Sequence, residues 1–257
     1  MSSYQVTARN YSGPSENRIH SDDIARKYGF SGALVPGVAV WGHLTHPLVE
    51  RFGERWLEHS VNETRFFKPA YDGDRLIIAL EENPDGYLVT GHNESGTLLA
   101  EIRGSIPEEL PPAEDDAAFS APARSAERME ITWENITEGE PFPEWHFQVV
   151  ADGNQRYAEE ISDELPIYRF VAHPHWLLAV ANQCLVREYV LPAWIHVGSG
   201  IRFRELVRVG DTLGVNAVPV QKWEKKGHQF VRLYIRYHRL GVLTTEIFHT
   251  AIFRIAE

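Results

Sequence analysis

Three side chains in the segment "SENRIH", residues 15–20, have the types and spacing of an acid–base site. His20 supplies an imidazole, which is the side chain best suited to act as a base near neutral pH. Asn17 supplies an amide that can order a short loop. Ser15 can hold a water molecule, but its hydroxyl does not act as a general acid or base near pH 7. We therefore predict a catalytic site of His20, Asn17 and Ser15. Its base is His20, and its first residue, Ser15, is not a carboxylate.

Simpler structural roles are open for the same residues and for other histidines. His20 can cap the acidic segment that follows it, and Asn17 can serve as a turn residue. His43 and His46 are three residues apart, which is a spacing that two metal ligands can use. The sequence offers them no third ligand, so we predict buried structural histidines and no metal site. No glycine-rich phosphate loop is present either, and we predict no cofactor.

The chain contains an internal repeat. "RFFKPAYDGDRL" (65–76) matches "RFRELVRVGDTL" (202–213), and Gly73 and Gly210 differ by 210 − 73 = 137 positions. Carried back without a gap, this offset pairs Asn17 with Asn154, His20 with Tyr157 and Gly37 with Pro174. A register of this length indicates two copies of one structural unit. We predict an N-terminal domain of residues 1–106, a Pro- and Ala-rich linker of residues 107–127, and a C-terminal domain of residues 128–257.

Both copies predict the same order of elements. A short acidic helix comes first ("SDDIARKYG" and "YAEEISDEL"), and a long apolar helix follows at about 38–52 and 175–190. The strands that come next are expected at 60–68, 74–82, 86–93 and 97–105, and at 194–206, 211–223, 228–239 and 242–255. An antiparallel meander after one long helix must bury that helix against its inner face. This predicts the α+β class and a double hotdog fold whose two sheets join into one surface.

The second copy of the motif admits two alignments. The gapless register places Asp152, Asn154 and Tyr157 at the motif positions. The alternative uses "SDELPIY", with Asp163, Pro166 and Tyr168, but it leaves few residues before the long helix. We prefer the gapless register, and either alignment lacks the histidine. We expect the two motif loops to lie far apart, with the second site filled or closed.

Composition narrows the expected partners and location. The net charge is −11 and the basic residues form no run, so nucleic acid and anionic membrane surfaces are not expected partners. Cys184 is the single cysteine, which allows no intramolecular disulfide and fits a reducing cytoplasm. The first residues contain no apolar stretch typical of a signal peptide. The most apolar segment is interrupted by charged and amide side chains, so no membrane span is predicted.

The first copy, "NRIHSDDIARKYGFSGALVPGVAV…RFFKPAYDGDRL", resembles MaoC-like dehydratases and (R)-specific enoyl-CoA hydratases. Their motif runs Asp-x-Asn-Pro-[Leu/Ile]-His. The resemblance implies that His20 is the general base and that Asn17 orders the loop. It also implies that Asp22 and the helix start at Gly37 and Val38 contact substrate, a backbone N–H there binding the thioester carbonyl. The chain departs from the motif at Ser15, where the family has Asp, and at Arg18, where it has Pro.

The function implied by this resemblance is hydration or dehydration of a 2-enoyl or 3-hydroxyacyl thioester of coenzyme A or acyl carrier protein. The resemblance also allows a homodimer. Because Ser15 replaces the acid, a non-catalytic acyl-thioester-binding protein or supporting subunit is the alternative. A thioesterase is a third and weaker interpretation, since the long helix of the first copy has no carboxylate before Glu50.

Overall fold

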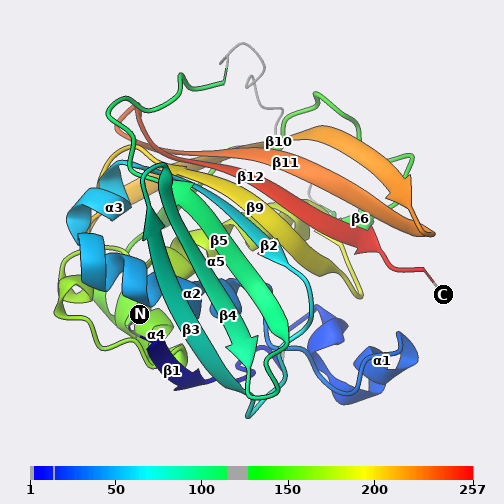
Figure 1. Ribbon diagram of the computed structural model, residues 1–257. Helices are drawn as coiled ribbons and strands as arrows, with labels where there is room; N and C mark the ends of the chain where they lie inside the picture. Colours follow the sequence, from blue (N-terminus) through cyan, green and yellow to red (C-terminus); the bar gives the residue numbers. More distant parts are fainter. Residues whose placement is uncertain (1–2, 14, 115–126, 257) are drawn as a thin grey trace.

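The computed structural model describes residues 3–13, 15–114 and 127–256, and one long antiparallel sheet dominates it (Figure 1). The sheet has ten strands in the order β1-β3-β4-β5-β2-β9-β12-β11-β10-β7. The first five are β1 (Ser3–Thr7), β3 (Arg75–Asn83), β4 (Gly86–Asn93), β5 (Leu98–Ser105) and β2 (Ser60–Phe66). The other five are β9 (Ile195–Phe203), β12 (Val242–Arg254), β11 (His228–Arg239), β10 (Thr212–Lys225) and β7 (Trp145–Gln148). A separate parallel pair is formed by β6 (Met129–Glu130) and β8 (Tyr189–Val190).

The two halves join through the antiparallel pair β2–β9, which runs from Ser60 opposite Phe203 to Arg65 opposite Gly198. Strands from residues 3–105 occupy one side of this join, and strands from residues 145–254 occupy the other. The sheet is therefore continuous, as the repeat predicted. The exact domain boundaries stay a prediction.

Both long helices, α2 (Gly37–Phe52) and α5 (Pro174–Glu188), lie on the same side of the sheet (Figure 1). Gly53 ends α2 with a φ of 59°, a conformation that favours glycine. The helices also touch each other, and a Cβ on Gly42 would lie 2.9 Å from Cβ of His175. Glycine at this position permits the close approach. Because each helix also packs on the strands, the arrangement is a helix pair on a sheet and not a bundle.

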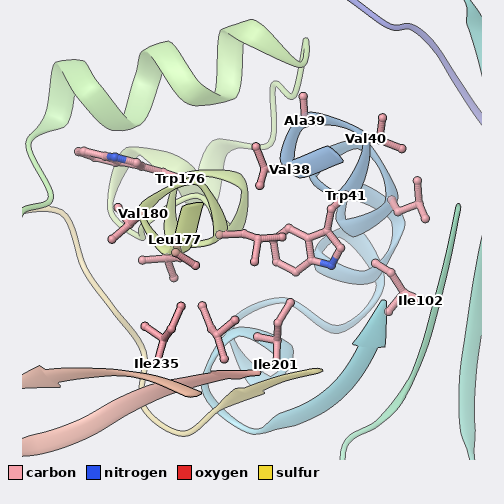
Figure 2. Close-up of a cluster of buried hydrophobic side chains, with 14 of the residues drawn as sticks. Val38, Ala39, Val40, Trp41, Ile102, Trp176, Leu177, Val180, Ile201 and Ile235 are labelled. Carbon is pink, nitrogen blue, oxygen red and sulfur yellow. The ribbon is translucent and has the colours of Figure 1, made fainter. Parts of the chain in front are cut away.

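The core fills the space between these helices and the sheet (Figure 2). Trp41 of α2 and Leu177 of α5 point toward Ile201 and Ile235 on the strands, and all four side chains are at most 3% exposed. Truncating a buried aromatic of this size to alanine costs about 3–5 kcal/mol. The helix-on-sheet core predicted from the two apolar segments is confirmed.

Shorter helices complete the structure. They are α1 (Asp22–Lys27), α3 (Glu54–Glu58) and α4 (Ala151–Glu160), together with the 3₁₀ helices η1 (Arg18–His20) and η3 (Pro166–Arg169). None of the helices in the described part of the chain is long and apolar enough to cross a membrane.

Backbone contacts confirm the offset of 137 from the long helices onward. The isolated bridge between Leu34 and Tyr71 recurs between Val171 and Arg208, the same offset at both ends. Before the helices the gapless register is wrong. Ala8 and Val149 make equivalent bonds to Asp74 and Asp211, yet they differ by 149 − 8 = 141 positions.

The structure favours the alternative alignment of the second motif. His20 N bonds Asn17 O within η1, and Tyr168 N bonds Leu165 O within η3, so His20 corresponds to Tyr168. By the same count Ser15 corresponds to Asp163. The gapless register failed because the second copy has no segment like residues 21–33, which carry α1. The acidic helix expected in the second copy at "YAEEISDEL" is also displaced, since α4 spans Ala151–Glu160 and lies before the motif.

Residues 107–114 of the predicted linker contact the second half through hydrogen bonds to Arg204 and Glu246. Pro111 O accepts a hydrogen bond from Arg204 at 2.6 Å. Glu114 N donates to the buried carboxylate of Glu246 at 3.3 Å. Residues 115–126 of the predicted linker lie outside the described residues.

Candidate functional site

Two cavities meet at His20. The first has a volume of about 200 Å³ and is mostly apolar, with Phe30, Leu34, Val40 and Phe66 in its wall. The second has a volume of about 360 Å³ and contains more polar side chains. Residues common to both linings are Asn17, His20, Pro36, Asn182 and Trp194. His20 therefore lies where an apolar chamber and a polar chamber adjoin.

Asn17 anchors the motif loop to the other half of the molecule. Its Oδ1 accepts a hydrogen bond from Trp194 N at 3.1 Å, and its Nδ2 donates to Trp194 O at 3.0 Å. Arg18 N donates to Pro192 O at 3.0 Å. These partners are backbone groups of fixed donor and acceptor type, so they fix the orientation of the amide. The site is built at the junction of the two halves.

The hydrogen bonds of His20 define its tautomer. Nδ1 lies 2.7 Å from Leu34 O, and because a carbonyl only accepts, Nδ1 must carry the proton. Nε2 lies 3.3 Å from Asn17 Nδ2, which donates to it. Burial lowers the pKa of His20, although the bond to Leu34 O opposes this effect. His20 is thus a neutral imidazole near pH 7, with the Nε2 lone pair accepting one long hydrogen bond from Asn17.

Ser15 lines the second cavity, and the hydrogen bonds of the described residues do not join it to His20. Its hydroxyl donates to Asn17 O at 3.2 Å, and the side chain is exposed. The adjacent Glu16 pairs with Arg128 at 3.0 Å, and this hydrogen bond lowers the pKa of Glu16. Neither residue supplies a protonated carboxyl group.

The start of α2 lies beside His20, as expected from the sequence. Gly37 lines the first cavity and Val38 lines the second. Both occupy the first turn of α2, where backbone N–H groups have no carbonyl partner inside the helix. A carbonyl oxygen placed at this end receives hydrogen bonds and the favourable end of the helix dipole.

Asp22 lies apart from these groups. Its Oδ1 accepts a hydrogen bond from Ala33 N at 2.8 Å, and its Oδ2 pairs with Arg26 at 3.4 Å on the surface. The carboxylate is absent from the described linings of both cavities. Asp22 orders the loop after α1, and its expected contact with substrate stays a prediction without support from this geometry.

The second half contributes directly to the cavity around His20. Tyr157, Glu160 and His175 line the second cavity together with the first motif. The expectation that the Tyr157 region lies far from His20 was therefore wrong. It assumed that Tyr157 belongs to a symmetry-related motif loop, whereas Tyr157 sits on α4. Burial raises the pKa of Glu160, which makes it a carboxyl group that can carry a proton closer to neutral pH.

The position equivalent to the first motif is closed in the second half. Asp163 is buried and accepts from His46 Nδ1 at 2.9 Å and from His173 Nε2 at 3.3 Å. Despite the opposing effect of burial, these two histidines hold the pKa of Asp163 well below its usual range. Tyr168 is 3% exposed. The described linings of the cavities include neither Asp163 nor Tyr168.

Sequence reasoning missed the contributions that come from the second half. Trp194, Asn182 and His196 line the first cavity beside His20. Their positions depend on the β2–β9 join and on how α5 sits against α2, and no local motif encodes either contact. His46 was expected to be structural, and its hydrogen bond to the buried Asp163 gives it such a role. Among the described residues no group of three or more His, Cys, Asp or Glu side chains is arranged to hold a metal ion.

Comparison with known proteins supports the fold. No family model matches the sequence, and a search of curated proteins found no match. Among solved structures, a protein described as a MaoC domain dehydratase from Chloroflexus aurantiacus matches with a TM-score of 0.66 at 13% identity, covering 97% of this chain and 93% of that one. Rv0216 from Mycobacterium tuberculosis, which has a double hotdog fold, matches with a TM-score of 0.62 at 13% identity, covering 98% and 95%. A protein described as an oleoyl thioesterase from Lactobacillus plantarum matches with a TM-score of 0.55 at 11% identity, covering 99% and 96%.

These matches define the fold of the chain. The chain has a double hotdog fold of the α+β class, and its structural neighbours include MaoC-like dehydratases over nearly the whole chain. Neighbours described as thioesterases share the same architecture. These matches, at 11–13% identity, show the fold.

Proposed function

We propose that this protein hydrates a 2-enoyl thioester, or dehydrates the corresponding 3-hydroxyacyl thioester, carried by coenzyme A or an acyl carrier protein. The observation that carries the proposal is the neutral His20, whose Nδ1 donates to Leu34 O and whose Nε2 faces the amide of Asn17 at the junction of the two cavities. The N-terminus of α2 adjoins it in the same cavity. Proton transfer next to a thioester carbonyl requires a base, and the enolate oxygen that develops requires hydrogen-bond donors such as those at a helix N-terminus.

In the hydration direction, His20 Nε2 takes a proton from water while the water oxygen bonds to C3 of the enoyl group. The electron pair of the C2–C3 double bond moves toward the carbonyl, which becomes an enolate stabilised by the N–H groups at Gly37. The enolate then collapses and C2 takes a proton. The imidazolium of His20 can return that proton, so that one water is added in total. Dehydration runs through the same steps in reverse.

A carboxyl group that donates the proton to C2 would assist His20, and the candidates in the second cavity are Glu160 and Glu16. Their environments differ. The pKa of Glu16 is lowered by Arg128, whereas the pKa of Glu160 is raised by burial. A general acid must hold a proton at the working pH, which favours Glu160.

The apolar cavity fits the acyl chain of such a substrate. Its wall is made of aliphatic and aromatic side chains from both halves, and it opens beside His20. Lys68 is exposed at this cavity and offers a positive charge in a chain of net charge −11. A phosphate of the thioester carrier is the natural partner for that charge.

The deciding experiment mixes the purified protein with crotonyl-CoA and follows the enoyl absorbance together with the free thiol. We expect loss of the enoyl absorbance without thiol release. Thiol release would indicate a thioesterase. Binding without either change, across several chain lengths, would establish the non-catalytic acyl-thioester-binding protein, for which the serine at position 15 already argues.

A further inference from the structure

Helix α5 carries two adjacent amide side chains within an apolar run. Asn182 and Gln183 interrupt the sequence "HWLLAVANQCLV". Most side chains of this run are buried, whereas Asn182 and Gln183 are partly exposed and line the second cavity. Of these two amides, Asn182 lines the first cavity as well. Asn182 therefore lies at the junction of the cavities, where His20 also lies.

The amide of Asn182 has one enclosed atom and one accessible atom. Oδ1 is buried and has no hydrogen-bond partner among the described residues. Nδ2 likewise makes no hydrogen bond within the described part of the chain, but it keeps surface that a ligand can reach. The reverse orientation would bury two unpaired N–H donors in place of one oxygen, which costs more. The amide nitrogen is therefore the atom that faces the cavities.

The other residues that line both cavities have no side-chain donor to spare. Pro36 has none. Asn17 Nδ2 already donates to Trp194 O and faces His20 Nε2. The indole N–H of Trp194 is buried away from the cavities, and His20 uses its N–H on a backbone carbonyl. Among the described residues shared by the two linings, Asn182 thus supplies the uncommitted side-chain donor.

We propose that Asn182 Nδ2 donates a hydrogen bond to the oxygen at C3 of the acyl chain, which belongs to water in hydration and to the 3-hydroxyl group in dehydration. The inference rests on the proposed function, because it requires an enoyl or 3-hydroxyacyl thioester beside His20. In hydration, one proton of the water passes to His20 Nε2 and the oxygen bonds to C3. The C2–C3 electron pair moves toward the carbonyl, and C2 then takes a proton. Asn182 contributes a hydrogen bond and transfers no proton.

A donor at this place completes the hydrogen bonds of the reacting water. Water gives one proton to His20 Nε2 and uses one lone pair to bond C3, so a donor to its other lone pair fixes the direction of attack. Ser15 does not provide this donor, since its hydroxyl donates to Asn17 O at 3.2 Å. In dehydration the same hydrogen bond stabilises the negative charge that develops on the leaving oxygen. Asn182 is in this sense a catalytic residue contributed by the second half.

Two leucine variants separate this role from the shape of the cavity. Leucine is close to asparagine in volume, and Asn182→Leu removes the donor together with the buried unpaired oxygen, so the fold should be retained. Gln183→Leu is the matched control, because it makes the same kind of change at the neighbouring amide of the second cavity. Urea unfolding of both variants checks that the fold is intact.

Binding is measured with two inert ligands that differ only at C3. The amide analogues of 3-hydroxybutyryl-CoA and butyryl-CoA carry NH in place of the thioester sulfur, so their C2 protons are too weakly acidic for water to be eliminated. We expect Asn182→Leu to weaken binding of the 3-hydroxy analogue about 2- to 10-fold, the size of one hydrogen bond, and to leave binding of the butyryl analogue unchanged. Gln183→Leu should keep the wild-type preference for the hydroxyl group.

The kinetic counterpart is crotonyl-CoA hydration. Asn182→Leu should lower kcat by about 2- to 10-fold and keep KM within about 2-fold, because crotonyl-CoA has no 3-hydroxyl group to bind. Equal weakening of both analogues by Asn182→Leu, or the same loss of preference in Gln183→Leu, would overturn the inference. Hydration of crotonyl-CoA by the wild type would then keep the proposed function. A wild type that neither hydrates crotonyl-CoA nor prefers the 3-hydroxy analogue would remove both.

Discussion

The two halves of the molecule hold corresponding motif loops that carry opposite members of an acid–base pair. The first loop keeps the histidine, at His20, and has Ser15 where the carboxylate would be. The second keeps the carboxylate, at Asp163, and has Tyr168 in place of the histidine. The first loop faces two cavities, whereas Asp163 and Tyr168 are buried. The two halves of one repeated fold thus place corresponding loops in an open site and in a stabilising core.

The buried loop has become part of a polar network between the long helices. Asp163 joins His46 of α2 to His173, the residue that caps α5 by accepting from His175 N at 3.0 Å. Removing one partner of such a buried carboxylate is strongly destabilising. In the second half, the motif position therefore fixes how the helices sit together.

The largest expected difference between the two loops is the difference in activity between the His20→Ala and Tyr168→Phe variants. We expect His20→Ala to lower kcat/KM for crotonyl-CoA hydration by about 10²- to 10⁴-fold, the usual contribution of general acid–base catalysis. Tyr168→Phe should leave kcat/KM within about 2-fold, because its side chain lies outside both cavities. Comparable losses in the two variants would mean that the buried loop also takes part in the reaction.

The converse test is one of stability. Asp163→Ala should lower the free energy of unfolding by about 3–5 kcal/mol, because it leaves His46 and His173 without their buried acceptor. Ser15→Ala should change it by less than about 0.5 kcal/mol, since the Ser15 side chain is exposed. Urea unfolding of both variants measures the difference. If Asp163→Ala is as stable as wild type, the network does not hold the helices.

Acid should destabilise the protein well before carboxylates titrate. Burial lowers the pKa of His43 to about 4 and those of His175 and His249 to about 3, against 6.5 as the model value for each. Between about pH 6.5 and pH 4 the unfolded chain binds protons that the folded chain does not, so stability falls as pH falls. Asp163 does not contribute there, because its depressed pKa matters only below about pH 4.

Urea unfolding at pH 7, 6 and 5 measures this slope, and His175→Gln should reduce it, because position 175 then takes up no proton on unfolding. Two of the three lie in the second half. An unchanged slope in His175→Gln, with His43→Gln reducing it instead, would assign the acid sensitivity to the first half. A flat profile in the wild type would show that these histidines remain accessible to protons.

Much of this fold followed from sequence, and the reasons are local. The "GD-x-L" repeat located the strands and the helix starts, because a strand register and a helix cap depend on a few neighbouring residues. The second motif was misaligned because residues 21–33 have no counterpart there. The second copy has α4 before its motif instead, so the lengths nearly match and a gapless offset does not reveal the difference. His196 and Trp194 were missed because their contacts with Gly37 and Asn17 arise only when β2 pairs with β9.

The assignment of the missing acid is tested by Glu160→Gln, with Glu159→Gln as its matched control on the same helix. Glu159 is exposed, whereas Glu160 is half-buried in the second cavity. We expect Glu160→Gln to lower kcat for crotonyl-CoA hydration about 10-fold and to remove the alkaline limb of the pH–rate profile that its raised pKa produces. Identical profiles in both variants would exclude Glu160 as the proton donor.

The smallest expected change, and the one that restores the missing member of the first loop, is Ser15→Asp. A carboxylate at position 15 would lie in the cavity that holds His20 and would assist proton transfer, so kcat should rise about 2- to 5-fold, a small part of what general acid–base catalysis can contribute. The gain should be modest because Ser15 now bonds Asn17 O, and an aspartate cannot donate that bond. Ser15→Asn, which adds a similar volume without the charge, is the control and should give no gain. A fall in kcat on a substrate that the wild type handles well would instead show that the serine hydroxyl positions a reactant. In that case the two loops have diverged toward different chemistry, and the hydratase assignment should be replaced by another reaction of an acyl thioester.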